Sequence, residues 1–193
     1  MRHFFLPLLI ALLPTTALTE PVNSLRLYTE EYPPFSYQTD DRPSGINVEL
    51  LREALERLEI EAEISIVPWG RAQLFTREQD DSCFFSAART SDRELIYQWV
   101  GPLIEEHIVL YSLEYEPPAT SFTDAAGRAV GGQIADAYSD WVRDQGLVLD
   151  EVAEVPDNLE KLKRGRIDLW LACNPDIPED WLRALNSEIE ALR

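Results

Sequence analysis

Four polar side chains lie close together in the stretch SCFFSAARTSDRELIYQWVGPL, residues 82–103. Ser86 and Thr90 carry hydroxyls, and Arg89 and Arg93 carry guanidinium groups four residues apart. Guanidinium forks beside hydroxyls and free backbone N–H groups suit a carboxylate or another planar anion. Acidic residues also flank the second arginine, so the same spacing fits an exposed helix face with local ion pairs. The spacing alone leaves both interpretations open.

Two further loops place aromatic side chains directly after predicted strands. Residues 25–29 alternate apolar and polar, as a short strand does, and two prolines then hold Tyr32 and Phe35 on an extended loop. A second alternating strand is followed by Trp69 and Arg71. Rings fixed in this way suit stacking on a ligand, and they equally suit capping of the core.

Composition narrows the classes of function. The chain has 193 residues, a formal net charge of −18 and a pI near 4.4, which argues against nucleic acid or an anionic membrane surface as partner. No phosphate-binding loop, GxSxG or HExxH motif is present. His107 is the one histidine after the N-terminal leader, which disfavours a hydrolase triad. We therefore predict no catalytic residues, no metal site and no cofactor.

The N-terminus has the pattern of a secretory signal peptide. Residues 1–3 are basic, residues 4–13 form an apolar run too short to span a bilayer, and Thr15 and Ala17 fit the small positions before a cleavage site. No later run is long or apolar enough for a transmembrane helix. We expect cleavage near Ala17 and an exported protein without stable membrane insertion.

Helices and strands alternate along the rest of the chain. This pattern predicts an α/β fold with parallel strand pairing, divided by a polar crossover at residues 114–123 into two lobes with a ligand cleft between them. Asn47 is a candidate cap for the first helix. The expected strands are 25–29, 61–67, one around 84–85, 108–113, 129–132, 151–155 and 167–172, and the expected helices are 46–58, a short one from 68, 135–145, 158–164 and a last one after 176.

Six motifs in this order resemble the family 3 bacterial extracellular solute-binding proteins, and within them the branch of transporter substrate-binding domain proteins. They are YPPF (32–35), GINVELL (45–51), PWGRA (68–72), SAARTSDR (86–93), WVGP (99–102) and NLEKLKRGRIDLW (158–170). The resemblance implies a two-lobed periplasmic binding protein fold of type II. Family members usually have some tens of residues between the strand after GRID and the returning strand, and this chain has almost none, so we expect an abbreviated second lobe.

On this resemblance, residues 1–17 are the signal peptide, 18–113 are lobe 1 and 114–172 are the shortened lobe 2. Residues 173–193 are then a return segment and a helix that packs on lobe 1. The return of the chain toward lobe 1 would bring Cys173 near the strand that carries Cys83. We therefore predict a disulfide between them, with two buried thiols as the alternative.

The resemblance also implies a ligand site in the cleft. An aromatic side chain of the first loop packs on the ligand, and an arginine holds the carboxylate of an amino acid, here Arg93. An acidic residue for the ammonium group is expected after GRID, where Cys173 stands instead. The implied ligand-binding residues are Tyr32, Phe35, Trp69, Arg71, Ser86, Arg89 and Arg93.

The sequence thus predicts a periplasmic solute-binding protein, not an enzyme. We expect it to capture a small polar ligand, amino acid-like or an organic acid, and to deliver it to an inner-membrane ABC-type permease. One alternative is an enzyme of dehydratase or lytic type on the same scaffold, with Glu30 or Glu31 as its acid or base. The other alternative is a remnant that binds no ligand.

Overall fold

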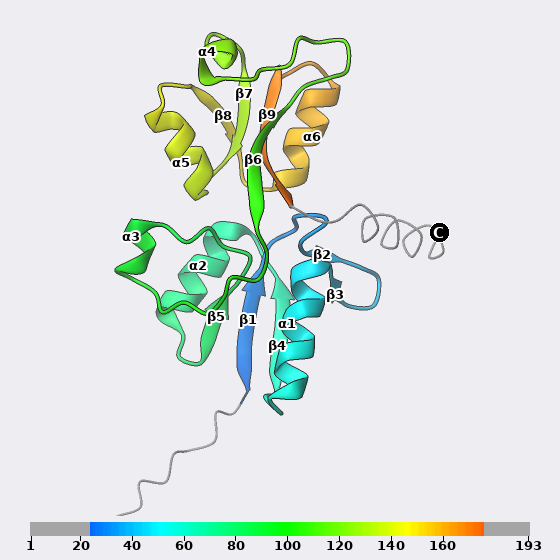
Figure 1. The fold of residues 1–193 in the computed structure, drawn as a ribbon. Helices are drawn as coiled ribbons and strands as arrows, with labels where there is room; N and C mark the ends of the chain where they lie inside the picture. Colours follow the sequence, from blue (N-terminus) through cyan, green and yellow to red (C-terminus); the bar gives the residue numbers. More distant parts are fainter. Residues whose placement is uncertain (1–23, 176–193) are drawn as a thin grey trace, which may run out of the picture.

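A computed structural model describes residues 24–175 of the chain. Two α/β lobes are stacked one above the other, and the long strands β6 and β9 of the upper lobe reach down to the boundary between them (Figure 1). We define lobe 1 as residues 25–105 and lobe 2 as residues 106–175. Within the described part, no helix is long and apolar enough to cross a membrane. The predicted signal peptide and the predicted last helix lie outside the described residues.

Lobe 1 contains a parallel three-stranded sheet in the order β4-β1-β5. Apolar side chains from β1, α1 and the end of β5 form its main core, with Leu27, Val48, Leu55 and Phe85 all buried. The elements of this lobe are β1 (Leu25–Thr29), β2 (Tyr37–Gln38), β3 (Pro43–Ser44), α1 (Ile46–Arg57), β4 (Ala62–Ile66), α2 (Trp69–Glu78), β5 (Ser82–Phe84) and α3 (Ser91–Glu94).

Helix α1 begins one residue after Gly45, which has a φ of 121°. We call the loop that carries Tyr32 and Phe35 the aromatic loop. A β-carbon at position 45 would lie 2.5 Å from the carbonyl oxygen of Phe35, so only glycine lets the helix start this close to that loop. Asn47, predicted as the cap, lies inside the helix and is buried. The cap prediction was wrong because the chain turns at Gly45, and this leaves the amide of Asn47 free to reach another loop.

Lobe 2 contains a four-stranded sheet in the order β6-β9-β7-β8. A core cluster of this lobe combines strand and helix residues, and Val130, Val142 and Leu169 are fully buried. The elements of this lobe are β6 (Glu106–Tyr111), α4 (Phe122–Ala125), β7 (Val130–Gln133), α5 (Ala137–Asp144), β8 (Leu149–Val152), α6 (Val155–Lys163) and β9 (Leu169–Pro175).

Strand β9 runs parallel to β7 and antiparallel to β6, with Cys173 opposite Ile108. The predicted strand near 108–113, placed at the end of lobe 1, therefore belongs to the sheet of lobe 2. This pairing also corrects the predicted disulfide. Cys83 is an exposed free thiol on β5, and Cys173 is a free thiol on β9, because β9 follows β6 and does not enter the sheet that contains β5.

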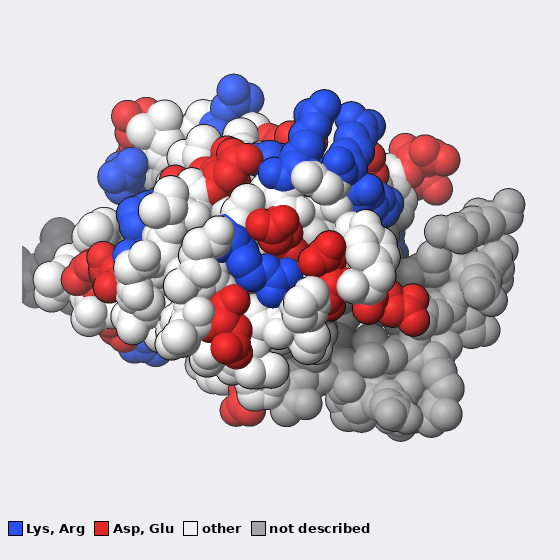
Figure 2. Space-filling model, turned by 90° about the horizontal axis from the view of Figure 1, so that it is seen from above, with Lys and Arg blue, Asp and Glu red and all other residues white. Residues whose placement is uncertain are grey.

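The outer end of lobe 2 carries charges of both signs. Figure 2 shows Lys and Arg side chains beside Asp and Glu side chains across this face. Lys161 forms an ion pair of 2.8 Å with Asp150, and Lys163 and Arg164 both pair with Glu160. These three cations therefore each have a neighbouring carboxylate as partner.

Candidate functional site

The loop after β1 is held in place by two buried hydroxyls. The hydroxyls of Thr29 and Ser36 lie 3.0 Å apart, and Ser36 donates to the carbonyl of Glu30 at 2.8 Å. The ring of Tyr32 lies edge-on to Phe35, with centroids 5.4 Å apart. These contacts fix the loop at the carboxyl end of the sheet, the end at which open α/β folds bind ligands.

Helix α2 contributes an indole to the boundary between the lobes. Trp69 is the first residue of the helix and is 3% exposed, with its ring edge-on to Phe84 at 5.3 Å. One turn later in the helix, the side-chain amide of Gln73 donates a hydrogen bond to the backbone carbonyl of Ala135 in lobe 2. Arg71, between them in the chain, is exposed. It faces lobe 2 closely enough to offset in part the rise in the pKa of Glu154 that burial causes.

The stretch that carries both predicted arginines begins with a strained residue. Ser86 has a φ of 61°, and its hydroxyl accepts a hydrogen bond of 2.9 Å from the side-chain amide of Asn47. Thr90 then caps α3 by accepting from the backbone N–H of Arg93. The short helix separates the two arginines onto different sides.

Arg89 and Arg93 have opposite surroundings. Arg89 is exposed, forms an ion pair with Glu94 and lies over the ring of Trp99, 5.9 Å from its centroid. Arg93 is 8% exposed and lies over the ring of Trp69 at 5.6 Å. Its Nη1 donates to the carbonyl of Ala88 at 3.0 Å. The ion-pair interpretation therefore describes Arg89, whereas Arg93 is buried, has no ion pair with another of the described residues, and remains the candidate for binding an anion.

Three donors of lobe 1 meet one acceptor of lobe 2. Trp69 Nε1, Gln73 Nε2 and Arg93 Nη2 donate to the carbonyl oxygen of Ala135 at 3.1, 3.2 and 3.4 Å. We call these three side chains the clamp. Ala135 lies just after β7, so the clamp is at the boundary between the two sheets.

Two carboxyl groups lie within electrostatic range of Arg93. Burial raises the pKa of Glu30 to about 8, and it also raises the pKa of Asp136, while the charge of Arg93 lowers both. Glu30 accepts a hydrogen bond from the side-chain amide of Gln133, which joins the end of β1 to the end of β7. Arg93 and these two carboxyl groups therefore form a set at the boundary that could match a ligand with both charges.

A second set of polar contacts lies where β9 meets the aromatic loop. The hydroxyl of Tyr32 accepts a hydrogen bond of 2.6 Å from the backbone N–H of Cys173. Tyr138 donates to a carboxylate oxygen of Glu106 at 2.6 Å. Burial, together with the charge of Glu106, raises the pKa of the Cys173 thiol. Tyr32 is therefore engaged by β9, and the thiol of Cys173 is protonated at neutral pH.

The structure brings some of the predicted site residues together at the boundary and leaves others apart. Trp69 and Arg93 meet at the clamp, while Tyr32 is bonded to β9 and Phe35 packs on Tyr32. Ser86 binds Asn47, Arg71 faces Glu154, and Arg89 is turned away. Gln73, Gln133 and Asp136 were not predicted as site residues. Gln133 is the last residue of β7 and Asp136 follows three residues later, so the carboxyl ends of the strands in both lobes were the signal that could have identified them.

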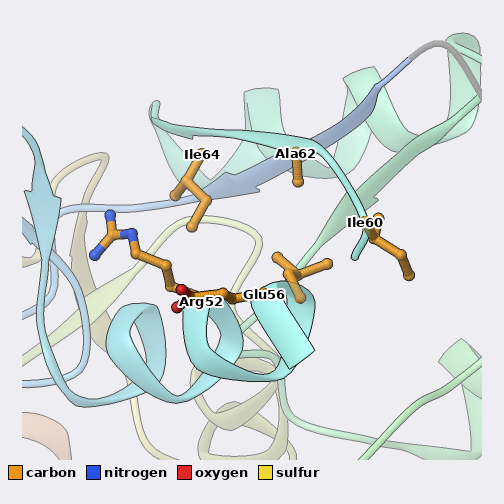
Figure 3. A pocket seen from close by; sticks show the side chains of 6 residues that line it. Arg52, Glu56, Ile60, Ala62 and Ile64 are labelled. Atoms are coloured by element: carbon orange, nitrogen blue, oxygen red, sulfur yellow. The ribbon is translucent and has the colours of Figure 1, made fainter. Parts of the chain in front are cut away.

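A surface cavity lies on the outer side of lobe 1, away from the clamp. It has a volume of about 370 Å³ and lies between α1 and β4 (Figure 3). One of its polar side chains, Arg52, has other partners, since it pairs with Glu49 at 2.6 Å and donates to the carbonyl of Pro43 at 3.0 Å. Among residues 24–175, no group of histidine, cysteine and acidic side chains is arranged to hold a metal ion.

Comparisons with known proteins agree on one fold. Residues 25–190 match the sequence model of the bacterial extracellular solute-binding proteins, family 3. An ancestral arginine-binding protein bound to glutamine is similar, with a TM-score of 0.70 and 18% identity over 78% of this chain and 69% of that chain. No curated protein sequence matches significantly.

Two other solved structures extend the similarity. The arginine-, lysine-, histidine-binding protein ArtJ from Geobacillus stearothermophilus matches with a TM-score of 0.67 and 19% identity, over 78% of this chain and 67% of that one. A histidine kinase sensor domain with similarity to periplasmic binding proteins matches with a TM-score of 0.73 and 18% identity, over 79% and 68%. At these identities the structural similarity shows the fold alone.

Proposed function

The chain belongs to the bacterial extracellular solute-binding proteins of family 3, and from that premise we propose that it binds a small amino acid-like solute between its two lobes. Family membership and the periplasmic binding protein fold support a binding function over catalysis. The residues at the boundary between the lobes support a ligand that carries both a carboxylate and a basic group.

The observation that carries this proposal is the buried guanidinium of Arg93. Among lysine and arginine side chains, full burial is rare unless the charge is paired. Arg93 is 8% exposed, and both hydrogen bonds of its guanidinium go to neutral backbone carbonyls, those of Ala88 and Ala135. A ligand carboxylate would supply the negative charge that these carbonyls lack and would bind the guanidinium fork through two hydrogen bonds.

The basic group of the ligand would face the two carboxyl groups. A cation placed beside Glu30 and Asp136 would favour their ionised forms and offset the effect of burial on their pKa values. Structurally similar proteins are described as binding arginine, and in one case arginine, lysine and histidine. We therefore rank cationic amino acids first among the candidate ligands.

We also propose that the protein is exported and acts in the periplasm as the receptor for an ABC-type permease. The pattern of residues 1–17 supports export, and a similar protein is described as the substrate-binding protein of an amino acid ABC transporter. Intact-mass measurement of protein recovered from the periplasm should show the loss of about seventeen residues if the leader is cleaved near Ala17. A full-length mass in that compartment would contradict export by cleavage.

The test of binding is calorimetric titration of the mature protein with L-arginine, L-lysine, L-glutamine, L-glutamate and agmatine, which is arginine without its carboxylate. We expect L-arginine or L-lysine to bind and agmatine to bind at least tenfold more weakly, because agmatine has no group for Arg93. Equal binding of agmatine and L-arginine would contradict the role of the guanidinium. No heat with any of the five would contradict the ligand class.

An enzyme is the second candidate, because Glu30 has the properties of a general acid. Its carboxyl group is 5% exposed and burial raises its pKa to about 8, so it holds a proton at neutral pH. The family and the similar structures consist of binding proteins. Recovery of each titrated amino acid unchanged after long incubation would reject the enzyme, and conversion that stops in Glu30→Gln would support it.

A further inference from the structure

More hydrogen-bond donors point at the carbonyl oxygen of Ala135 than this oxygen can accept at full strength. A carbonyl oxygen has two lone pairs, whereas a carboxylate offers about four acceptor positions on two oxygens. Three donors from the clamp converge on this one atom within 3.4 Å, and one of them belongs to a charged guanidinium. The arrangement suits an anion better than the neutral group that fills it.

The residue that presents this carbonyl has a disfavoured backbone. Ala135 has a φ of 62°, in the left-handed region where a β-carbon crowds the following carbonyl. Glycine adopts this region readily, but alanine does so only when its surroundings hold it there. The clamp contacts therefore act against a local preference for another conformation.

Lobe 2 anchors the turn on both sides of Ala135. Before it, the backbone N–H of Gln133 donates to the hydroxyl of Ser139 at 2.9 Å. After it, Asp136 caps α5 and accepts from the backbone N–H and the hydroxyl of Ser139 at 2.8 and 3.0 Å. Because one serine of α5 holds both flanks, residues 134–136 form a compact turn that projects its carbonyl toward lobe 1.

We propose that the turn of residues 134–136 is a built-in occupant of the clamp, whose Ala135 carbonyl holds the two lobes together until a ligand carboxylate displaces it. We call this segment the latch turn. Gln133, next to it, adds a second contact between the lobes through its hydrogen bond to the buried carboxyl of Glu30. The identity of the displacing group rests on the proposed function, whereas the closing contact is a property of the protein alone.

The latch turn has a measurable consequence for binding. A ligand that needs the clamp can bind only molecules in which the carbonyl has left it, so the apparent affinity is reduced by the fraction of such molecules. A change that weakens the latch turn should therefore open the lobes in the absence of ligand and tighten the binding of carboxylate ligands. A ligand without a carboxylate does not compete with the carbonyl, and its affinity should change little.

The first experiment measures the distance between the lobes without ligand. Spin labels at Glu53→Cys on α1 and Glu160→Cys on α6 report it, in a background in which Cys83 and Cys173 are replaced by serine. Both label positions are exposed. We expect one short distance for the otherwise unchanged protein, and a broad distribution of longer distances for Ala135→Val, because a β-branched residue does not adopt this φ.

Ala135→Gly is the matched control, since glycine adopts the observed φ freely and should keep the short distance. Gln73→Ala provides an independent variant in lobe 1 that removes one of the three donors without touching the latch turn, and it should populate the longer distances in part. Circular dichroism verifies that each variant is folded. The short distance retained in both Ala135→Val and Gln73→Ala would overturn the proposal, as would long distances in the unchanged protein.

The second experiment titrates L-arginine and agmatine into the unchanged protein and Ala135→Val. We expect the valine variant to bind L-arginine at least fivefold more tightly and agmatine with an affinity changed less than twofold. Weaker or equal binding of L-arginine by the valine variant would overturn the competition. If L-arginine binds neither protein while the distances follow the expected pattern, the proposed ligand class fails and the closing contact stands.

Discussion

Lobe 1 contributes side chains to the clamp, whereas lobe 2 contributes a backbone carbonyl. Trp69, Gln73 and Arg93 come from α2 and α3, and the single acceptor comes from the turn after β7. Side chains determine which chemical group is bound, while the same carbonyl would be present with almost any residue at position 135. If the proposed function holds, lobe 1 carries the specificity of the site and lobe 2 controls access to it.

The two lobes also differ in how the site is connected to the core. In lobe 1, Trp69 belongs to a core cluster with Tyr28 and Ala72, so a clamp residue is also a core residue. In lobe 2, the core cluster contains residues of β7 and α5 but no residue of the latch turn. Changes at the clamp should therefore affect both the stability of the core and binding, whereas a change at Ala135 should affect closure of the lobes and binding more than the core.

The largest expected effect is on stability in lobe 1. Trp69→Ala removes an indole that is 3% exposed, and truncation of a buried aromatic residue costs about 3–5 kcal/mol in the free energy of unfolding. Trp141→Ala in lobe 2 is the matched control, since this ring is 45% exposed and makes one edge-on contact, with Phe122. Its loss should cost about 1 kcal/mol. Urea denaturation measures the free energy of unfolding of both variants. Equal decreases would contradict the connection between the clamp and the core of lobe 1.

The next effect is on ligand affinity. Arg93→Ala should weaken binding of the best amino acid by about 2–5 kcal/mol, or thirty-fold to several thousand-fold, because it removes one partner of a buried charged pair. Arg93→Lys should also bind poorly, since an ammonium group lacks the guanidinium fork. Arg89→Ala, four residues earlier, should change affinity by less than about 1 kcal/mol, because its ion pair with Glu94 is exposed. Titration calorimetry measures these affinities. Similar losses of affinity in Arg93→Ala and Arg89→Ala would contradict different roles for the two arginines.

A smaller effect concerns pH. Burial raises the pKa of Glu30 from its ordinary 4.5 to about 8, so the folded protein keeps a proton that the unfolded chain releases between these values. The free energy of unfolding should therefore fall as pH rises from about 5 to about 8 and level off above it. Asp136 and Glu154 add to the rise in this pKa, while Arg93 and the hydrogen bond from Gln133 oppose it.

Glu30→Gln mimics the protonated carboxyl and isolates this contribution from that of other groups. We expect the difference in melting temperature between Glu30→Gln and the unchanged protein to grow between pH 5 and pH 8, at about 2–4 °C per kcal/mol for a chain of this size. Thermal denaturation at four pH values measures it. Parallel melting curves for the two proteins would show that Glu30 does not titrate in this range.

The smallest expected effect is that of reductant. Because Cys83 and Cys173 are free thiols on different sheets, a reducing agent should leave the melting temperature unchanged. Burial raises the pKa of both thiols, but Cys83 is exposed and Cys173 is only partly exposed, so under native conditions Cys83 should be alkylated faster. Mass spectrometry after timed alkylation measures the order. A reductant-dependent loss of stability would restore the disulfide predicted from the sequence.

Much of the fold could be predicted because it follows from local periodicity. Helix α1 was expected at 46–58 and lies at 46–57, and β1 lies where its alternating residues predicted it. The family resemblance rested on motifs within such elements and is confirmed by the match over residues 25–190. The short strands β2 and β3 and the helix α4 were not predicted, because two- to four-residue elements carry no period.

The sequence by itself determined the α/β alternation, the family and the residue types available for binding, since each depends on neighbours along the chain. The tertiary structure alone decided which of two arginines four residues apart is buried, because this depends on how α3 packs against α2 and lobe 2. It decided that β9 follows β6, which keeps Cys83 and Cys173 apart. It also placed the carbonyl of Ala135 in the clamp, a position that no pattern of side chains records, because every residue carries the same backbone oxygen.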